Sequence, residues 1–521
     1  ILKLNIQDRF TKKLPADANL ENNRRQVNGA CFSFVKPKKT SQSSLIHYCP
    51  EMLKELGLTE KDAKSERFLN VFTGNEILPN TTPYAMCYGG HQFGNWAGQL
   101  GDGRAINLAE IKYNNKHWAL QLKGAGPTPF SRTADGLSVL RSSIREYLCS
   151  EAMYHLGVPT TRALSLALSG DQVLRDVLYN GNPEYEKGAI VSRIAPTFIR
   201  FGNFEILAAQ QDTKTLKSLV NYTIEQHFTE LGKPSKAIYL KFFKAVAVKS
   251  MEMVIHWQRV GFVHGVMNTD NMSIIGLTID YGPYGWLEDY DQGWTPNTTD
   301  STNKRYRYGT QPQIVLWNLL QLANALYPLI EEAEPLQAIL NEYQDDVAIA
   351  YTEMMKTKLG LFEKNANDSS LIQELEEVLQ LSETDMTIFF RSLVNFNKDN
   401  ATECLAVVAD AFYKPEEIKE EIKNKWEVWF AKYAERLKLE FKSDSERTTF
   451  MNSVNPKYVL RNYMAQLAIE DAEKGNYKLI DELFQLLKKP YHEQPENEKW
   501  YAKRPDWARN KVGSSMLSCS S

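Results

Sequence analysis

The sequence predicts an α+β fold of two lobes, in which a sheet-bearing N-lobe precedes a mostly helical C-lobe. Residues 76–205 are rich in glycine and in strand-forming patterns, with one strong helical pattern among them. Residues 206–500 instead repeat apolar side chains at steps of three and four, which is the period of amphipathic helices. A polar segment at residues 264–282 interrupts the helical half near its start and carries the first candidate site.

The two ends of the chain are expected to flank these lobes. Residues 1–75 predict an extension packed on the N-lobe, with a helix around residues 46–56. Residues 501–521 predict a tail that contains Cys519. Within the C-lobe the periodicity predicts helices at residues 216–231, 241–260, 313–326 and 371–393.

The composition is that of a globular protein and excludes some classes of function. The 521 residues carry 61 basic and 64 acidic side chains, a net charge of −3, which argues against a dedicated nucleic-acid binder. Two local basic runs, one from Lys36 to Lys39 and one from Lys304 to Arg307, are more typical of solvated faces or turns. No apolar run reaches the roughly 18 residues that a membrane span needs, so no membrane is expected as a partner.

The cysteines and the N-terminus bear on location. The chain shows no signal peptide, and because it does not start with Met, a trimmed targeting segment stays open. The cysteines lack CxxC spacing, which favours a reducing compartment, either a bacterial-type cytoplasm or, after removal of a transit peptide, mitochondria. Five of them are expected in packed settings, and Cys519 in a terminus without a core; the six are Cys31, Cys49, Cys87, Cys149, Cys404 and Cys519.

Residues 264–280, HGVMNTDNMSIIGLTID, predict a site for a divalent metal bound to nucleotide phosphates. Asn271 offers an amide oxygen and Asp280 a carboxylate, with a strand-like stretch, MSIIGLTI, between them. Two hard ligands suit Mg²⁺, which keeps several waters and accepts phosphate oxygens, with Mn²⁺ as the alternative. The simpler alternative is an edge strand with an Asn-rich turn that bonds only its own backbone.

The same segment resembles the catalytic centre of protein kinases, which suggests a kinase-like fold. His264 and Asn271 keep the seven-residue step of that centre, and Asp280-Tyr281-Gly282 takes the place of its DFG triplet. Val266 stands where a kinase has its catalytic Asp, so Asp270 is the nearby carboxylate that can accept a hydroxyl proton. The segment therefore predicts a kinase-like site with a displaced base.

The N-lobe supplies candidates for binding the phosphates. Two glycine-rich stretches, GGHQFG from Gly89 and GQLGDGR from Gly98, allow close approach of backbone N–H groups to phosphate, although ordinary loops can be equally rich in glycine. Residues 117–123 alternate as a strand that ends in Lys123, and residues 138–156 predict a helix that carries Glu146. A strand Lys paired with a helix Glu is how kinases hold a phosphate-binding Lys, whereas the alternative is two solvated side chains.

Two arginines complete a cationic set. Arg193 and Arg200 are seven residues apart across a turn and suit bidentate contacts with an anion. Together with Arg104 and Lys123 they would place four cations around one triphosphate, more than a kinase usually commits to its terminal phosphates. This surplus hints that the β- and γ-phosphates lie deep in the site as the retained leaving group.

Long stretches of the chain resemble the selenoprotein O family, the YdiU-type proteins. The matching strings are GGHQFGNWAGQLGDGRA, QLKGAGPTPFSRTADGLSVLRSSIREYL, HGVMNTDNMSI, DYGPYG and the terminal SCSS, and the resemblance covers essentially the whole chain. It implies a kinase-like pseudokinase that binds ATP inverted and transfers AMP to Ser, Thr or Tyr hydroxyls of proteins, itself included. The alternatives are a kinase that uses the γ-phosphate and a non-catalytic ATP-binding scaffold.

The resemblance also implies roles for particular residues. Asp270 would be the base, Asn271 and Asp280 the Mg²⁺ ligands, and Glu146 the partner of Lys123. The residues at the nucleotide would be Gly101, Gly103, Arg104, Lys123, Asp135, Gly136, Arg193 and Arg200. In some relatives the terminal Cys pairs with a Cys that follows the DFG-like triplet, but residues 293–297 here contain none, so redox locking of Cys519 by that route is doubtful.

Overall fold

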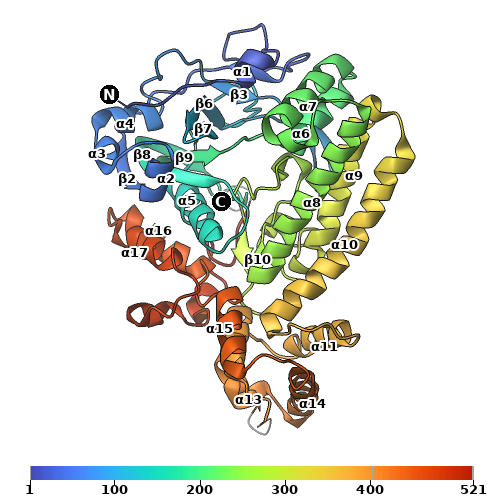
Figure 1. Ribbon diagram of the computed structural model, residues 1–521. Helices are drawn as coiled ribbons and strands as arrows, with labels where there is room; N and C mark the ends of the chain where they lie inside the picture. The colour runs from blue at the N-terminus through green and yellow to red at the C-terminus, as the bar shows by residue number, and fades with distance from the viewer. Residues whose placement is uncertain (1, 178, 400–403, 519–521) are drawn as a thin grey trace.

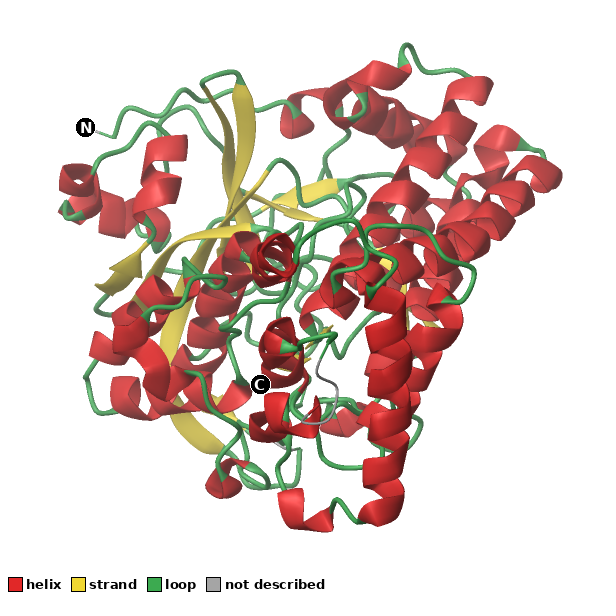
Figure 2. Ribbon diagram, turned by 60° about the horizontal axis from the view of Figure 1, so that its bottom comes forward, coloured by secondary structure: helices red, strands yellow, loops and turns green. Residues whose placement is uncertain are grey.

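The computed structural model describes residues 2–177, 179–399 and 404–518. It is a mixed α and β protein in which an antiparallel sheet occupies one part and long helices occupy another (Figure 1). Figure 2 shows the strands gathered on one side of the molecule and the longest helices on the other. The predicted α+β composition is therefore confirmed.

The main sheet has seven strands among the described residues, in the order β1-β3-β6-β7-β9-β8-β2. Its neighbours pair antiparallel, and both edge strands come from the first 48 residues. The chain before residue 76 is thus part of the sheet. The strands are β1 (Phe32–Phe34), β2 (Ser44–Tyr48), β3 (Tyr84–Met86), β6 (Ala105–Tyr113), β7 (Lys116–Lys123), β8 (Arg162–Arg175) and β9 (Glu184–Ala195).

The prediction of a helix at residues 46–56 is partly wrong. Residues 44–48 form β2 and pair with β8, and only then does α2 (Pro50–Glu55) begin, with Pro50 in its first turn. Pairing with a strand more than a hundred residues away overrides the local helical pattern here. Two further short helices, α3 (Glu60–Ala63) and α4 (Glu66–Phe72), follow, and α1 (Phe10–Lys13) precedes them.

The predicted strand and helix of the N-lobe are confirmed. The strand expected at residues 117–123 is β7, and the helix expected at residues 138–156 is α5 (Leu140–His155). This helix contacts β8 and β9, and Gly157, with φ of +75°, follows its end. The two elements bring Lys123 and Glu146 to the same side of the sheet.

The helical part is built around α8 (Lys236–Val260), α9 (Gln311–Ile330) and α10 (Ala333–Leu359), which lie side by side (Figure 1). Two preceding helices, α6 (Phe201–Ala209) and α7 (Thr213–His227), link them to the sheet. Residues 308–330 are long and apolar enough to cross a membrane by length and composition, contrary to the expectation from sequence. Half of the most apolar 18-residue stretch in this segment is buried against other helices, as in the core helix of a globular fold.

The prediction of a single helix at residues 371–393 is wrong. The chain forms α11 (Asp368–Leu379) and α12 (Met386–Ser392), separated by residues that pair with other segments. Asp385 caps α12 by accepting the N–H of Ile388 at 3.0 Å, and it also binds Arg461 at 2.6 Å. This buried carboxylate starts a new helix where periodicity alone suggests continuation.

The C-terminal residues return to the sheet-bearing part. Among the later helices, α16 (Asn462–Glu473) and α17 (Lys478–Leu487) both pack on α5. The tail also contacts the segment after Asp280, since the carbonyl of Leu517 accepts the N–H of Thr298 at 2.7 Å. Cys519 lies outside the described residues. The other helices here are α13 (Cys404–Val407), α14 (Glu420–Leu437) and α15 (Asp444–Val454).

The remaining cysteines match the expectation from sequence. Cys31, Cys49, Cys87, Cys149 and Cys404 are all buried and unbridged. Burial raises the pKa of the Cys87 thiol to about 12, so this thiol stays protonated at neutral pH.

Candidate functional site

A cavity of about 780 Å³ opens between the sheet and the loop at residues 264–283. It is large enough for a nucleotide. Most of the site residues that the sequence predicts line this cavity, namely Gly101, Gly103, Arg104, Lys123, Asp135, Gly136, Arg193, Asp270, Asn271 and Asp280. Glu146 and Arg200 lie behind this lining and contact it.

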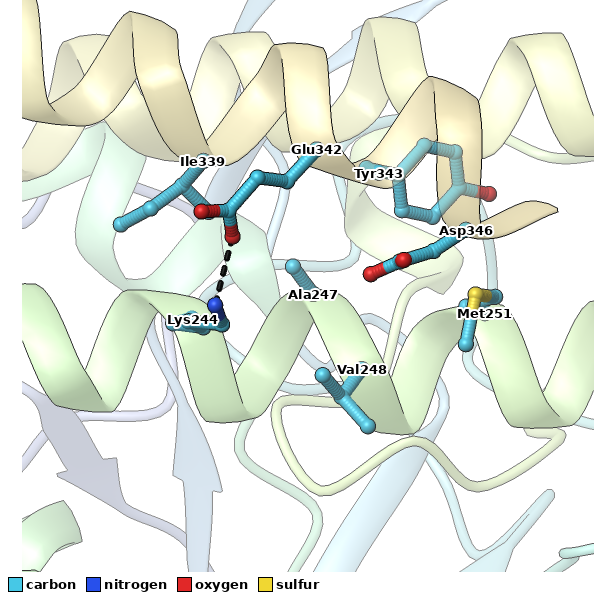
Figure 3. Close-up of a pocket in the computed structure, with 8 residues that line it drawn as sticks. All are labelled: Lys244, Ala247, Val248, Met251, Ile339, Glu342, Tyr343 and Asp346. Carbon is cyan, nitrogen blue, oxygen red and sulfur yellow. Dashed lines mark hydrogen bonds and ion pairs between the residues drawn. The ribbon is translucent and has the colours of Figure 1, made fainter.

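A second pocket, between α8 and α10, differs in scale (Figure 3). Its volume is about 10 Å³, the space of a single water, and the Lys244–Glu342 ion pair of 2.5 Å crosses it. It cannot hold a nucleotide.

Lys123 and Glu146 form a buried ion pair at the inner wall of the large cavity. Lys123 is the last residue of β7, and Glu146 lies in the second turn of α5. Burial lowers the pKa of Lys123 to about 8, although Glu146 opposes the shift. Burial alone would raise the pKa of Glu146, but Lys123 and Arg193 outweigh it and hold that pKa below its usual value. The alternative of two solvated side chains is therefore wrong.

Arg193 and Arg200 converge on Asp280. Arg193 Nη1 is 2.5 Å from Asp280 Oδ1, and the same nitrogen is 2.9 Å from Glu146 Oε1. Arg200 pairs with the other carboxylate oxygen of Asp280 and stacks on Tyr88, its Cζ 4.6 Å from the ring centroid. These two guanidinium groups drive the pKa of Asp280 well below its usual value despite burial. Arg200 does not line the cavity, and its guanidinium instead contacts the carboxylate of Asp280 and the carbonyl of Asp270.

The segment between Asn271 and Asp280 is not the strand that its composition suggests. It makes two isolated bridges, Ser273 to Arg200 and Thr278 to Thr160, and turns at Gly276, whose φ is +70°. Asp280 itself has φ of +56°, in the left-handed region that is costly for a residue with a side chain. The ion pairs with both arginines hold it there.

Asp270 lies in a short 3-10 turn, Thr269–Asn271, at the cavity wall. Burial raises its pKa to about 7, while Arg200 and Gln92 act in the opposite direction. Gln92 Nε2 donates to Asp270 Oδ2 at 3.3 Å, and Oδ1 is buried without a hydrogen-bond partner in the described residues. A carboxylate with a pKa near neutrality and a free oxygen suits a general base.

His264 has a structural place. It is 1% exposed, its Nε2 bonds the carbonyl of Ile279 at 2.8 Å, and its ring stacks on Trp257. It therefore fixes the residue before Asp280 and does not reach the cavity.

The residues present fit a divalent metal ion. The amide nitrogen of Asn271 donates to the carbonyl of Val266 at 2.9 Å, which leaves the amide oxygen as the atom for coordination. With the carboxylate of Asp280 this gives two oxygen donors in the wall of one cavity, a set that suits a hard cation completed by phosphate and water. A separate cluster of Cys49, Glu51 and Glu151 has ligand spacing, but it does not line this cavity, and burial raises the pKa of the Cys49 thiol, which keeps that thiol protonated.

The glycine-rich loop packs tightly against the segment that follows β7. A Cβ on Gly101 would lie 2.4 Å from Phe130, and one on Gly136 would lie 2.3 Å from the backbone of Gly126. Asp135 is bound by both terminal nitrogens of Arg175, each at 2.8 Å. Arg175, which sequence reasoning missed, thus holds Asp135 at the cavity edge.

A hairpin of β4 (Gly89–Gln92) and β5 (Asn95–Gln99) lies against the Asp270 turn, a contact that sequence reasoning also missed. The N–H of His91 donates to Thr269 Oγ1 at 2.7 Å, and the imidazole bonds Glu205 of α6 at 2.6 Å. A Cβ on Gly90 would lie 2.9 Å from Asp270 Oδ1. The glycine pair in GGHQFG is the available sequence signal, since only glycine permits this approach.

The chain matches a known protein family over most of its length. A family model described as protein adenylyltransferase SelO matches residues 16–488. The chain belongs to the SelO family. It is 63% identical over 519 residues to the protein nucleotidyltransferase YdiU of Flavobacterium johnsoniae, and 53% identical over 536 residues to that of Rhodopirellula baltica. Each comparison covers 99% of both chains.

Membership in the SelO family makes the chain a nucleotidyltransferase. The family implies ATP as substrate and a divalent metal as cofactor. The resemblance inferred from the sequence is confirmed.

Proposed function

We propose that the chain transfers AMP from ATP to the hydroxyl groups of Ser, Thr or Tyr side chains in proteins and releases pyrophosphate. The observation that carries this proposal is the buried set of Lys123, Glu146, Arg193 and Asp280 at the inner wall of the cavity, with Asp270 in the same lining. Such a set of fixed charges binds the β- and γ-phosphates deep in the site, where they serve as the leaving group. ATP is then inverted relative to its place in kinases, and the α-phosphorus faces the acceptor.

In the proposed step, Asp270 accepts the proton of the acceptor hydroxyl. The hydroxyl oxygen forms a bond to the α-phosphorus, and the bond from the α-phosphorus to the bridging oxygen breaks, so pyrophosphate leaves with that electron pair. Lys123, Arg193 and Arg104 offset the charge that develops on pyrophosphate. Asn271 and Asp280 would hold a divalent metal ion, which would supply further positive charge to the phosphates.

The finer assignments belong to the same proposal. The metal is Mg²⁺, since two protein oxygens with phosphate and water make its usual shell. The fold is a kinase-like pair of lobes, residues 76–205 and 206–500, with residues 1–75 as an extension and 501–521 as a tail. ATP and hydroxyl-bearing proteins, including the chain itself, are the partners, with no nucleic acid or membrane. The location is cytoplasmic, or mitochondrial if a transit peptide has been removed.

Mass spectrometry of the modified protein tests the proposal. The purified chain is incubated with ATP and Mg²⁺, alone and with a mixture of soluble proteins, and modified peptides are sequenced. The proposal expects an AMP adduct on a Ser, Thr or Tyr side chain with the wild type and none with Asp270→Ala. A phosphate adduct would instead indicate a kinase, and no adduct would indicate an ATP-binding scaffold.

A further inference from the structure

The basic run from Lys304 to Arg307 forms one wall of a second groove, of about 410 Å³, beside the nucleotide cavity. Phe93 lines both the cavity and this groove, so the two adjoin at its ring. The groove also lies at the start of α9, where Thr310 and Gln313 line it. Its lining is Phe93, Asp300, Asn303, Arg305, Arg307, Thr310, Gln313 and Ile314.

The arginine side chains of this groove are not used to bind acidic groups of the chain. Within the described residues, neither Arg305 nor Arg307 makes an ion pair with a carboxylate. Arg305 is instead held by aromatic rings, its Cζ 4.6 Å from the centroid of Trp317, and its buried Nε has no hydrogen-bond partner. A guanidinium that is fixed by stacking and makes no ion pair with a carboxylate is preorganised to bind an anion.

The acidic residue in the lining is already engaged. The two carboxylate oxygens of Asp300 accept the backbone N–H groups of Arg305 at 3.0 Å and Tyr306 at 2.7 Å. Asp300 is 2% exposed, so it shapes the turn from inside. The surface that the groove offers to a ligand is therefore positive.

Hydrogen bonds fix this wall relative to the base. The hydroxyl of Tyr306 donates to Asn268 Oδ1 at 2.7 Å, two residues before Asp270. The N–H of Phe93 donates to the same Tyr306 oxygen at 2.9 Å. A ligand in the groove is thus held at a defined place beside the Asp270 turn.

We propose that this groove binds an acidic side chain of the protein acceptor, in the same extended segment as the hydroxyl that receives AMP. This inference rests on the proposed function, because it concerns the acceptor of that reaction. The phosphates of ATP have Lys123 and Arg193 in the main cavity, which leaves the groove beyond Phe93 for a different anion. A carboxylate matches the fork of an arginine.

Three synthetic peptides test the proposal, each with one Thr hydroxyl flanked by Glu, Ala or Lys residues. Transfer of label from ATP labelled at the α-phosphate is measured for each peptide. The wild type is expected to modify the Glu-flanked peptide about tenfold faster than the Ala-flanked peptide, since one charge-assisted hydrogen bond contributes about this much. In the double variant Arg305→Gln, Arg307→Gln the ratio is expected to fall to about one.

The charge reversal Arg307→Glu is a second variant, and it is expected to modify the Lys-flanked peptide in preference to the others. Misfolding could not produce such a gain. Lys233→Glu, the same charge reversal at an exposed loop residue, is the matched control and keeps the wild-type ratio. A wild-type ratio near one, or a ratio that stays at the wild-type value in both arginine variants, would refute the role proposed for the groove. Neither result would contradict the transfer reaction. If the α-label appears neither on any peptide nor on the chain, both the transfer reaction and the role of the groove are refuted.

Discussion

Arg193 binds Asp280 at 2.5 Å and, through the same nitrogen, binds Glu146 at 2.9 Å. One guanidinium thereby joins β9, α5 and the segment after Asn271. Because 3% of the Arg193 side chain is exposed, these ion pairs act in a medium where electrostatic interactions are strong and an unpaired charge is costly. The charges proposed to bind the nucleotide also hold the sheet and the helical part together.

Replacement of Asp280 by Ala is expected to be more damaging than loss of any single arginine. It removes a metal ligand, and because even the outer-shell partners of a metal contribute about 10–100-fold, transfer should fall by at least about 100-fold. Rates of AMP transfer by Asp280→Ala and Arg193→Gln, each with saturating Mg²⁺, provide the comparison. A larger loss in Arg193→Gln would contradict the role given to Asp280.

Glu146→Gln is expected to weaken both stability and ATP binding. It leaves Lys123 without its buried ion-pair partner and Arg193 with Asp280 alone, which should lower the free energy of unfolding by about 3–5 kcal/mol. Glu151→Gln, on the same helix, breaks the buried pair with Arg162 instead and is the matched control. Denaturant unfolding should show both losses, whereas the affinity for ATP should fall in Glu146→Gln only. Equal ATP affinities in the two variants would refute the link between Glu146 and the phosphates.

The affinity for ATP is expected to fall as the pH rises through about 8. Burial lowers the pKa of Lys123 to about 8, so the ammonium is charged below this pH and loses its proton above it. ATP binds the charged form, and its affinity should therefore change little between pH 7, where Asp270 titrates, and pH 8, and decline by up to about tenfold per pH unit above pH 8. Equilibrium titration of ATP across this range measures the effect, and Lys123→Met should abolish the decline. A decline that persists in Lys123→Met would assign it to another group.

The hairpin of β4 and β5 is expected to set the position of Asp270. In Gly90→Ala the new Cβ would lie 2.9 Å from Asp270 Oδ1, so the carboxylate must move. A displacement of about 1 Å can cost about 100-fold in rate, and turnover should fall towards this extent while ATP affinity stays the same. Asn95→Ala, at an exposed position of the same hairpin, is the control. Turnover of Gly90→Ala equal to that of the control would show that the hairpin does not position the base.

Much of the site could be predicted because its residues carry local signals. Lys123 ends a strand that alternates over seven residues, and Glu146 lies on a helix with clear periodicity and a terminal glycine, so both elements could be predicted. Their pairing was suggested by the likeness to kinases, with two solvated side chains as the alternative. Asp280 and Asn271 were found by their spacing. The five core cysteines could be placed because no ligand motif surrounds them.

The parts that could not be predicted depend on partners distant in the chain. Residues 44–48 form a strand because β8 offers an edge, and residues 380–385 break a helical pattern because Asp385 meets Arg461. Gln92 reaches Asp270 across 178 residues, and the glycine pair before Gln92 indicates a close approach without identifying Asp270 as the partner. For Arg200, its contact with Asp280 depends on the turn of residues 272–279, whose apolar composition suggested a strand.

The central claim is that AMP, with its α-phosphorus, is the group transferred. Parallel reactions with ATP labelled at the α- or the γ-phosphate, in the presence of acceptor protein and Mg²⁺, test it most directly. The account predicts label on protein from α-labelled ATP alone, dependent on Asp270 and Asp280, with the γ-label recovered in pyrophosphate. Label on protein from γ-labelled ATP would contradict it.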